Sequence, residues 1–420
     1  MALRDRRTLV VAALTVLLAL ASYAFAAAAI ERPNQLDRRV DSIAAGTLLA
    51  QPATALVDRA RQQAALRRAH WTIPGLVIVQ LFEAVALFYL WSSGGAAALR
   101  DRLRRRFRSE WTVRFLFGAA LALVARLAGF VPAFYLYRVD RTLGLSVELT
   151  GAWALAWLGY TLLGTIVAGL IAAVVLRLAE RTHQWYAYTI VAILALSVGW
   201  SYAGQYLQTA PRQIRPVAGT LSSELQVVLA RAHLSNVPVM IEVVHNSPSG
   251  GAVVLGLGEA HRILLTDTLV AGSTSPEIAY EVAYELGHIV HHDLISIALI
   301  VGGVIIVFGA LAVVIADRIP FRRDDDPLSR LAIVGALLAL VYLAAVPVRN
   351  AALRSYDFGA DRYAVALTGD SAAAVRALVR DSDQRMEEVC PEASATFLLY
   401  THPGTGARIA AINHVSSGCP

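Results

Sequence analysis

The chain has 420 residues, of which 57% are hydrophobic and only 16% are charged, and its formal net charge is +6. Its apolar runs are far longer than a helix in a soluble core needs, which excludes a soluble globular protein and indicates an integral membrane protein. All 37 basic residues are arginines, and they lie beside the apolar runs, so the positive charge does not require a nucleic-acid partner.

Seven apolar segments are close to 20 residues long or longer, the length that a helix needs to cross the hydrocarbon of a bilayer. The first could be a cleaved signal peptide, but its apolar core is longer than such peptides have, which favours a retained anchor. The sequence therefore predicts a mainly α-helical protein with about seven transmembrane spans: Thr8–Ile30, Ile73–Trp91, Val113–Tyr137, Trp153–Leu176, Tyr186–Tyr206, Leu294–Ala316 and Leu331–Val348.

Arginine is unevenly distributed between the loops that join these spans. The loops on the side of the N-terminus hold fifteen arginines, and the opposite short loops hold nine. By the positive-inside rule, the N-terminus is cytoplasmic and both hydrophilic segments, 207–293 and 349–420, are extracytoplasmic. The only cysteines, Cys390 and Cys419, follow the last span. An oxidising exterior would let them pair, and two unrelated thiols are the alternative.

The hydrophilic segments are typical of one α+β module that is split by the last two spans. Gly219–His233 has the pattern of a helix, Val237–Val244 is β-prone, and Ala252–Leu255 with Ile263–Leu265 is typical of a hairpin. We therefore divide the chain into four parts: a membrane domain with five spans (1–206), the first half of the module (207–293), a hairpin of two spans (294–348) and the second half of the module (349–420).

Residues 281–293 read Glu-Val-Ala-Tyr-Glu-Leu-Gly-His-Ile-Val-His-His-Asp. They match the zinc-binding helix motif HExxH, except that Tyr284 stands in place of the first histidine. We predict a helix over 276–292, with Ser275 as its N-cap and Pro276 at its first position. At about 100° per residue, its polar side chains form one stripe: Glu281, Tyr284, Glu285, His288, His291 and His292.

Together with three further segments, this motif makes the chain resemble the membrane zinc metalloproteases related to type I CAAX prenyl endopeptidase, a gluzincin-type family that includes bacterial heat-shock membrane proteases. The resemblance implies a zincin-like module, and seven spans agree with the prenyl endopeptidase branch. The four segments are a strand followed by Asp-Thr-Leu, the motif helix with its following aspartate, an Asp-x-x-Ala-Asp run, and His-Pro followed by Arg-Ile: 262–269, 284–293, 354–361 and 402–409.

The resemblance implies a zinc-dependent endopeptidase with one zinc ion per chain, which hydrolyses peptides or membrane proteins at the bilayer by means of metal-activated water. The edge of the predicted hairpin would hold the substrate backbone, with a purely structural hairpin as the alternative. The residues that the resemblance implies for the site are the zinc ligands His288 and Asp357 (a glutamate in the family), the base Glu285, the supporting carboxylate Asp361, and His402 or Arg408 beside the oxyanion.

Tyr284 allows three interpretations. In the first, its phenolate is a zinc ligand, which requires the metal to lower a pKa that is normally about 10. In the second, His288 and His292 are the chelating pair and one aspartate of the Asp-x-x-Ala-Asp run completes the site; a solvated His292 at the helix end is the alternative. In the third, no catalytic metal binds, and the chain is a pseudoprotease that acts as a binding or scaffold protein.

A channel, transporter or receptor is a further alternative. Arg114 and Arg126 fall in or near the third predicted span, where a charge is costly and often functional. Arg114 is close enough to the end of the span to reach the interface, and Arg126 would line the water-filled chamber that the resemblance implies. The four ordered segments favour the peptidase family.

Overall fold

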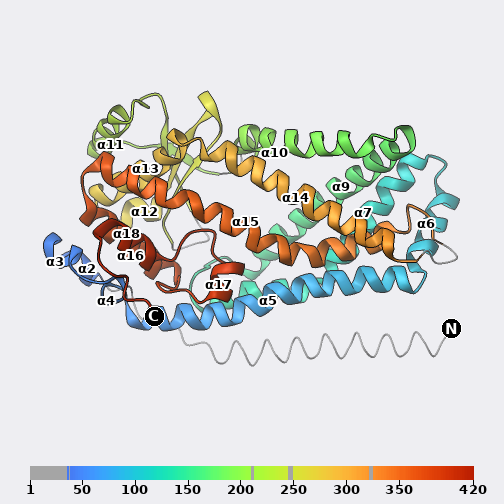
Figure 1. Cartoon of the computed structure of the whole chain (residues 1–420), viewed down its shortest axis with the longest axis horizontal. Helices are drawn as coiled ribbons and strands as arrows, with labels where there is room; N and C mark the ends of the chain where they lie inside the picture. The colour runs from blue at the N-terminus through green and yellow to red at the C-terminus, as the bar shows by residue number, and fades with distance from the viewer. Residues whose placement is uncertain (1–35, 37, 210–211, 245–248, 321–324) are drawn as a thin grey trace.

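The computed structural model describes residues 36, 38–209, 212–244, 249–320 and 325–420. The protein is elongated, with long helices running side by side over most of its length and a module of short helices and strands gathered at one end (Figure 1). The first predicted span, Thr8–Ile30, lies outside the described residues.

Six helices in the described part of the chain are long and apolar enough to cross a membrane, which confirms a multi-span helical membrane protein. In the most apolar stretch of each, at most 33% of the residues are buried inside the protein, as expected for helices that face lipid. The six are α5 (Arg59–Ser92), α7 (Glu110–Ala128), α9 (Thr150–Arg181), α10 (Trp185–Thr209), α14 (Asp293–Arg318) and α15 (Leu331–Thr368).

The prediction of one continuous span over Val113–Tyr137 is wrong. Helix α7 ends at Ala128, and a separate helix, α8 (Phe130–Thr142), follows it. Pro132 has no N–H to donate to the carbonyl of Ala128, and its ring would collide with that carbonyl if the helix continued. The chain therefore breaks at Gly129, and α8 packs against α5.

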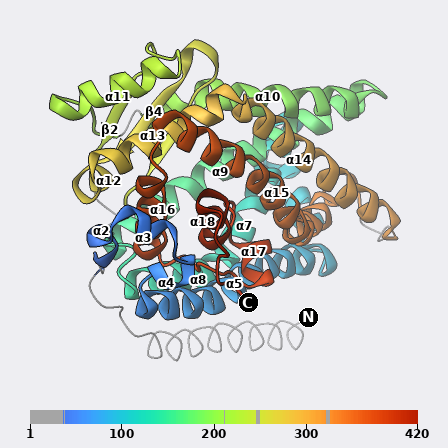
Figure 2. The same cartoon turned by 60° about the vertical axis from the view of Figure 1, so that its left-hand side comes forward.

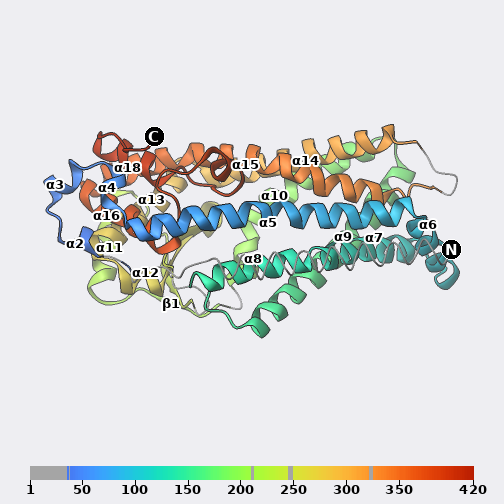
Figure 3. The ribbon, with the colours of Figure 1, turned by 90° about the horizontal axis from the view of Figure 1, so that it is seen from below.

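Two of the membrane helices are much longer than a bilayer requires. Helix α5 has 34 residues and α15 has 38, whereas about 20 are enough to cross. They pack against each other along the molecule (Figure 3). At the end far from the module, α6 (Gly95–Arg106) ends in three consecutive arginines. The surplus length of α15 carries Asp357 and Asp361 into the module.

The module contains a sheet of four strands in the order β1-β2-β4-β3. The predicted hairpin is confirmed, because β3 pairs antiparallel with β4, while β2 runs parallel to β4. The predicted first helix is also confirmed as α11 (Gly219–Arg231). Strand β3 lies at the edge of the sheet. The strands are β1 (Ile214–Pro216), β2 (Val239–Glu242), β3 (Ala252–Leu255) and β4 (Arg262–Thr266).

One hydrophobic core joins the two halves of the module. Ile263 and Leu265 of β4 belong to the same buried cluster as Leu286 of the motif helix and Val375 from beyond the last span. Figure 2 shows the motif helix between the sheet and the helices that follow the last span. The helices of the module are α2 (Arg39–Ser42), α3 (Ala45–Leu49), α4 (Ala53–Leu56), α12 (Asp267–Gly272), α13 (Ser275–Val290), α16 (Ser371–Arg385), α17 (Ala393–Leu398) and α18 (Thr405–Asn413).

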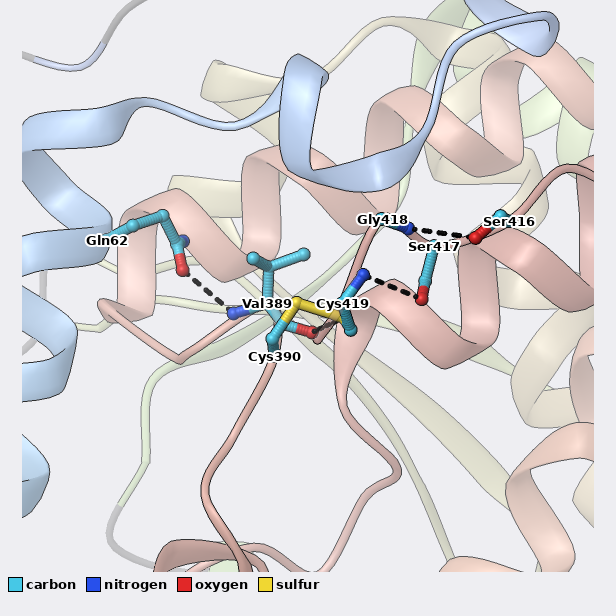
Figure 4. Close-up of a disulfide and its surroundings, with 7 residues drawn as sticks. All are labelled: Gln62, Val389, Cys390, Ser416, Ser417, Gly418 and Cys419. Carbon is cyan, nitrogen blue, oxygen red and sulfur yellow. Dashed lines mark hydrogen bonds between the residues drawn. A yellow bond between two sulfur atoms is a disulfide. The ribbon is translucent and has the colours of Figure 1, made fainter.

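The two cysteines form a disulfide, so the paired alternative holds (Figure 4). Cys390 follows α16, and Cys419 lies at the C-terminal end of the chain. Beside the disulfide, the N–H of Val389 donates a hydrogen bond of 2.8 Å to Oε1 of Gln62 on α5. The disulfide therefore ties the C-terminal tail to a segment that α5 holds in place.

We expect Cys419→Ser to lower the free energy of unfolding by about 2–4 kcal/mol, because the bond joins residues 29 positions apart and restricts the unfolded chain. Thermal unfolding of the purified protein measures the difference. The unaltered protein in reductant is the control and should unfold like the variant. Two alkylated thiols in unaltered protein purified without reductant would contradict the pairing.

Candidate functional site

The motif helix α13 begins one residue earlier than the sequence predicted. Its N-cap is Thr274 and not Ser275, because Thr274 forms a reciprocal capping box with Glu277. The backbone N–H of Thr274 donates to Glu277 Oε2 at 2.7 Å. The same carboxylate accepts a bond of 3.0 Å from Arg380 on α16. This start fixes the rotation of α13 and therefore the direction in which its polar stripe faces.

The stripe is shorter than predicted, because α13 ends at Val290. His291 closes the helix, and His292 has the left-handed backbone angle φ of 58°. Both side chains are exposed, and the ring of His291 meets Tyr363 edge-on at 5.9 Å. His292 therefore lies beyond the end of α13 and does not share a helical face with His288. The chelating pair of the second interpretation lacks the geometry on which it depends.

His288 is held in a fixed orientation. Its Nδ1 lies 2.8 Å from Oδ2 of the buried Asp293, and its Nε2 lies 3.9 Å from Oδ1 of Asp357. A carboxylate on one ring nitrogen directs the other nitrogen toward the site, as is usual for a histidine that binds a metal. Asp293 lies in one of the four segments that carry the resemblance, but its contact with His288 was not predicted from the sequence.

Glu285 is attached to the edge of the sheet. Its Oε2 accepts a hydrogen bond of 2.8 Å from the backbone N–H of Val254 in β3. Burial raises the pKa of Glu285 above its usual range, against the lowering effects of His288 and of the Val254 bond. The predicted base is therefore buried, faces the same site as His288, and lies beside the edge strand.

The hydroxyl of Tyr284 donates a hydrogen bond to Asp357. The distance from Tyr284 Oη to Asp357 Oδ1 is 2.7 Å, and the other oxygen of Asp357 lies 3.0 Å from Nδ1 of His402. The phenol ring meets His288 edge-on at 4.8 Å, and the guanidinium of Arg408 lies over it at 4.8 Å. Burial raises the pKa of Tyr284 well above its usual value of 10, and Arg408 opposes this only in part.

Asp361 and Arg408 form a buried ion pair behind Tyr284. Arg408 Nε and a terminal nitrogen bind the two oxygens of Asp361 at 2.9 and 2.7 Å. Asp361 also accepts a bond of 2.6 Å from the hydroxyl of Tyr280. Tyr280 was not predicted from the sequence, although it lies one helical turn before Tyr284. The structure thus brings together all the predicted site residues except His292: Tyr284, Glu285, His288, Asp357, Asp361, His402 and Arg408.

The arrangement does not fit the three-ligand zinc site that the resemblance implies. The Tyr284 hydroxyl and the His288 imidazole lie 2.7 and 3.9 Å from Asp357 Oδ1, close to the separation of about 3.3 Å between two ligands of a tetrahedral zinc. However, zinc takes thiolate, imidazole and carboxylate donors, and the third donor here is a phenol whose pKa burial raises well above 10. In the described ranges, no three His, Cys, Asp or Glu side chains are grouped so that they could hold a metal ion.

Comparison with known proteins identifies the module. The family model of peptidase family M48 matches residues 217–416. The matched residues make up a little less than half of the chain and are similar to peptidase family M48. This M48 module includes β2, β3, β4, α13, the module end of α15, and α18, so the match covers every element that contributes a residue to the site. It confirms the family that the four sequence segments predicted.

Two relatives are proteases by name, and one of them is named a metalloprotease. Over 251 residues, the chain is 25% identical to Protease HtpX homolog 1 of Streptomyces coelicolor, covering 58% of this chain and 77% of the relative. Over 329 residues, it is 24% identical to the uncharacterized metalloprotease YhfN of Bacillus subtilis, covering 72% and 73%. The crystal structure of S. mikatae Ste24p shares the fold with a TM-score of 0.70 at 16% identity, over 94% of this chain and 97% of that one.

Proposed function

We propose that this chain is a pseudoprotease of the M48 family that binds polypeptide segments at the membrane and holds no zinc in its resting state. The hydrogen bond from Tyr284 to Asp357 carries this proposal, because it joins the two residues that stand in place of zinc ligands of the family. The bond joins α13 to α15, which is the connection that a shared metal ion would otherwise make.

A zinc ion could use Tyr284 only as phenolate. With a reference pKa of about 10, removing the phenol proton at pH 7 costs about 4 kcal/mol, and burial of Tyr284 adds to that cost. Asp357 would also lose the hydrogen bond that it accepts from the phenol. The remaining protein ligands, His288 and Asp357, are one fewer than a catalytic zinc site normally has.

Polypeptide binding is supported by the position of β3. It is an edge strand, so its outer backbone groups are not paired with another strand, and α13 packs beside it. A peptide in extended form adds to such an edge through main-chain hydrogen bonds. The N–H of Val254 donates to Glu285, so the polar stripe of α13 lies directly along the place where a peptide would bind.

A second candidate is the zinc-dependent endopeptidase that the family implies. It is favoured by the residues that remain around the ligand positions: Glu285 as base, His288 oriented by Asp293, and Arg408 with His402 as candidates to face an oxyanion. Polypeptide binding alone would not require these residues in this arrangement, so their presence favours the endopeptidase. The two candidates differ in metal content and in cleavage.

The test is metal analysis and cleavage by the purified full-length protein in nanodiscs. We expect fewer than about 0.1 zinc ions per chain after exposure to excess Zn²⁺ and desalting, and no cleavage of an unfolded protein substrate. One zinc per chain together with cleavage that stops on chelation would reject the pseudoprotease in favour of the second candidate. Glu285→Gln is the control, because any cleavage that it retains comes from a contaminant.

We also propose that the N-terminus is cytoplasmic and that the module faces the extracytoplasmic side. The disulfide supports this, because such bonds persist in oxidising compartments. The arginine excess in the loops on the side of the N-terminus agrees with it. The alkylation experiment on Cys390 and Cys419 tests the orientation as well, since a cytoplasmic module would keep both thiols reduced.

A further inference from the structure

A cavity of about 470 Å³ lies on the face of the sheet that points away from α13. In β4, Ile263 and Leu265 belong to the core that α13 shares, whereas Leu264 between them lines the cavity. In β3, Val254 belongs to that core and Val253 lines the cavity. Opposite the sheet, the walls come from α5, from α8 and from the segment around the end of α16.

The cavity wall contains three arginines and three carboxylates. Each arginine forms an ion pair with an acidic side chain: Arg68 with Asp140 at 3.0 Å, Arg212 with Glu242 at 2.8 Å, and Arg385 with Asp381 at 2.6 Å. Two of the three carboxylates in the wall, Asp140 and Glu242, are therefore already neutralised. The third is Glu387.

Glu387 is partly buried, and within the described residues its carboxylate has neither a hydrogen bond nor an ion pair closer than 4.0 Å. Only its backbone groups are bonded, for example its carbonyl, which accepts from Ser382 and from Gln62. Burial and the nearby charge of Asp381 raise the pKa of Glu387, and the more distant charges of Arg385, His402 and Arg68 oppose this only in part. A partly buried carboxylate with no contacting cation is less stable than a paired one, and a cation beside it would stabilise its charged form.

We infer that this cavity takes the positively charged side chain of a lysine or arginine from a polypeptide bound along β3, with Glu387 as its counter-charge. The inference rests on the proposed binding of polypeptide. Side chains of an added strand alternate between the two faces of the sheet, so every second residue would point to the cavity side, next to Val253. The other residues would face α13 and Tyr284.

The experiment measures binding of fluorescent extended peptides to the full-length protein in nanodiscs. The peptides are identical except at one position, which is lysine, norleucine or glutamate. We expect the lysine peptide to bind about tenfold more tightly than the norleucine peptide, and the glutamate peptide to bind more weakly than both. Glu387→Gln should reduce the ratio of lysine to norleucine affinity to about one.

Glu224→Gln is the matched control, because Glu224 is an exposed glutamate on α11, outside the cavity. It should keep the tenfold preference. Equal binding of lysine and norleucine peptides by the unaltered protein would overturn the cationic subsite and leave polypeptide binding intact. No binding of any peptide would overturn both. If Glu387→Gln keeps the preference for the lysine peptide, another residue causes that preference and the role of Glu387 is overturned.

Discussion

Tyr284→His should bind about one zinc ion per chain, whereas the unaltered protein should bind less than about a tenth of that. The substitution places a second imidazole one turn before His288, whose Nε2 already lies 3.9 Å from Asp357 Oδ1, and it removes the phenol proton that opposes binding. At a free Zn²⁺ concentration of 100 times Kd, the variant should gain about 2.7 kcal/mol in unfolding free energy. Elemental analysis and thermal unfolding with and without chelator measure the two effects.

Tyr284→Phe is the matched control, because it loses the same hydroxyl but supplies no donor, and it should stay free of zinc. His288→Ala in the Tyr284→His background should abolish the gain. If the single variant folds but binds no zinc, combining it with Asp357→Glu tests whether the aspartate, one methylene shorter than glutamate, fails to reach the ion. Zinc bound equally by the unaltered protein and by Tyr284→His would contradict the role that we assign to the phenol.

Arg408→Met should destabilise the folded protein by about 3–5 kcal/mol, independently of any metal. Arg408 supplies both nitrogens of the bidentate pair with Asp361. Within the described residues, the Tyr280 hydroxyl alone would remain to stabilise this carboxylate, which is 1% exposed. Removing one partner of a buried ion pair leaves an uncompensated charge, which costs more than the pair itself contributes. The midpoint of thermal unfolding in nanodiscs measures the loss.

Arg212→Met serves as the control for this prediction, because Arg212 pairs with Glu242 while its side chain is 37% exposed. Solvent screens such a pair, and its loss should cost less than about 1 kcal/mol. Adding Asp361→Asn to Arg408→Met should recover much of the stability, since no buried charge then lacks a partner. Equal unfolding midpoints for Arg408→Met and the unaltered protein would show that the pair does not stabilise the fold.

The membrane helices and the family could be predicted from the sequence because both depend on local patterns. Apolar length identified the six described spans, and four short segments in a fixed order identified the M48 module. The break after α7 was missed because a hydropathy pattern continues through Pro132, although the missing N–H of proline was present in the sequence as a signal. The start of α13 was misplaced by one residue because Thr274 and Ser275 are both good caps, and only the position of Glu277 distinguished them.

The sequence by itself determined most of the side chains that reach the site, because motif order places them on α13, on α15 and in the C-terminal segment that contains His402 and Arg408. Only the tertiary structure decided what they do to one another. Tyr284 and Asp357 are 73 positions apart, and their hydrogen bond depends on how α15 crosses α13. Burial then raises the pKa of the phenol further, and burial results from packing of the whole module. Helical periodicity can indicate that a residue faces a site, but the protonation state and the partner of that residue depend on distances and solvent exclusion, which only the folded protein defines.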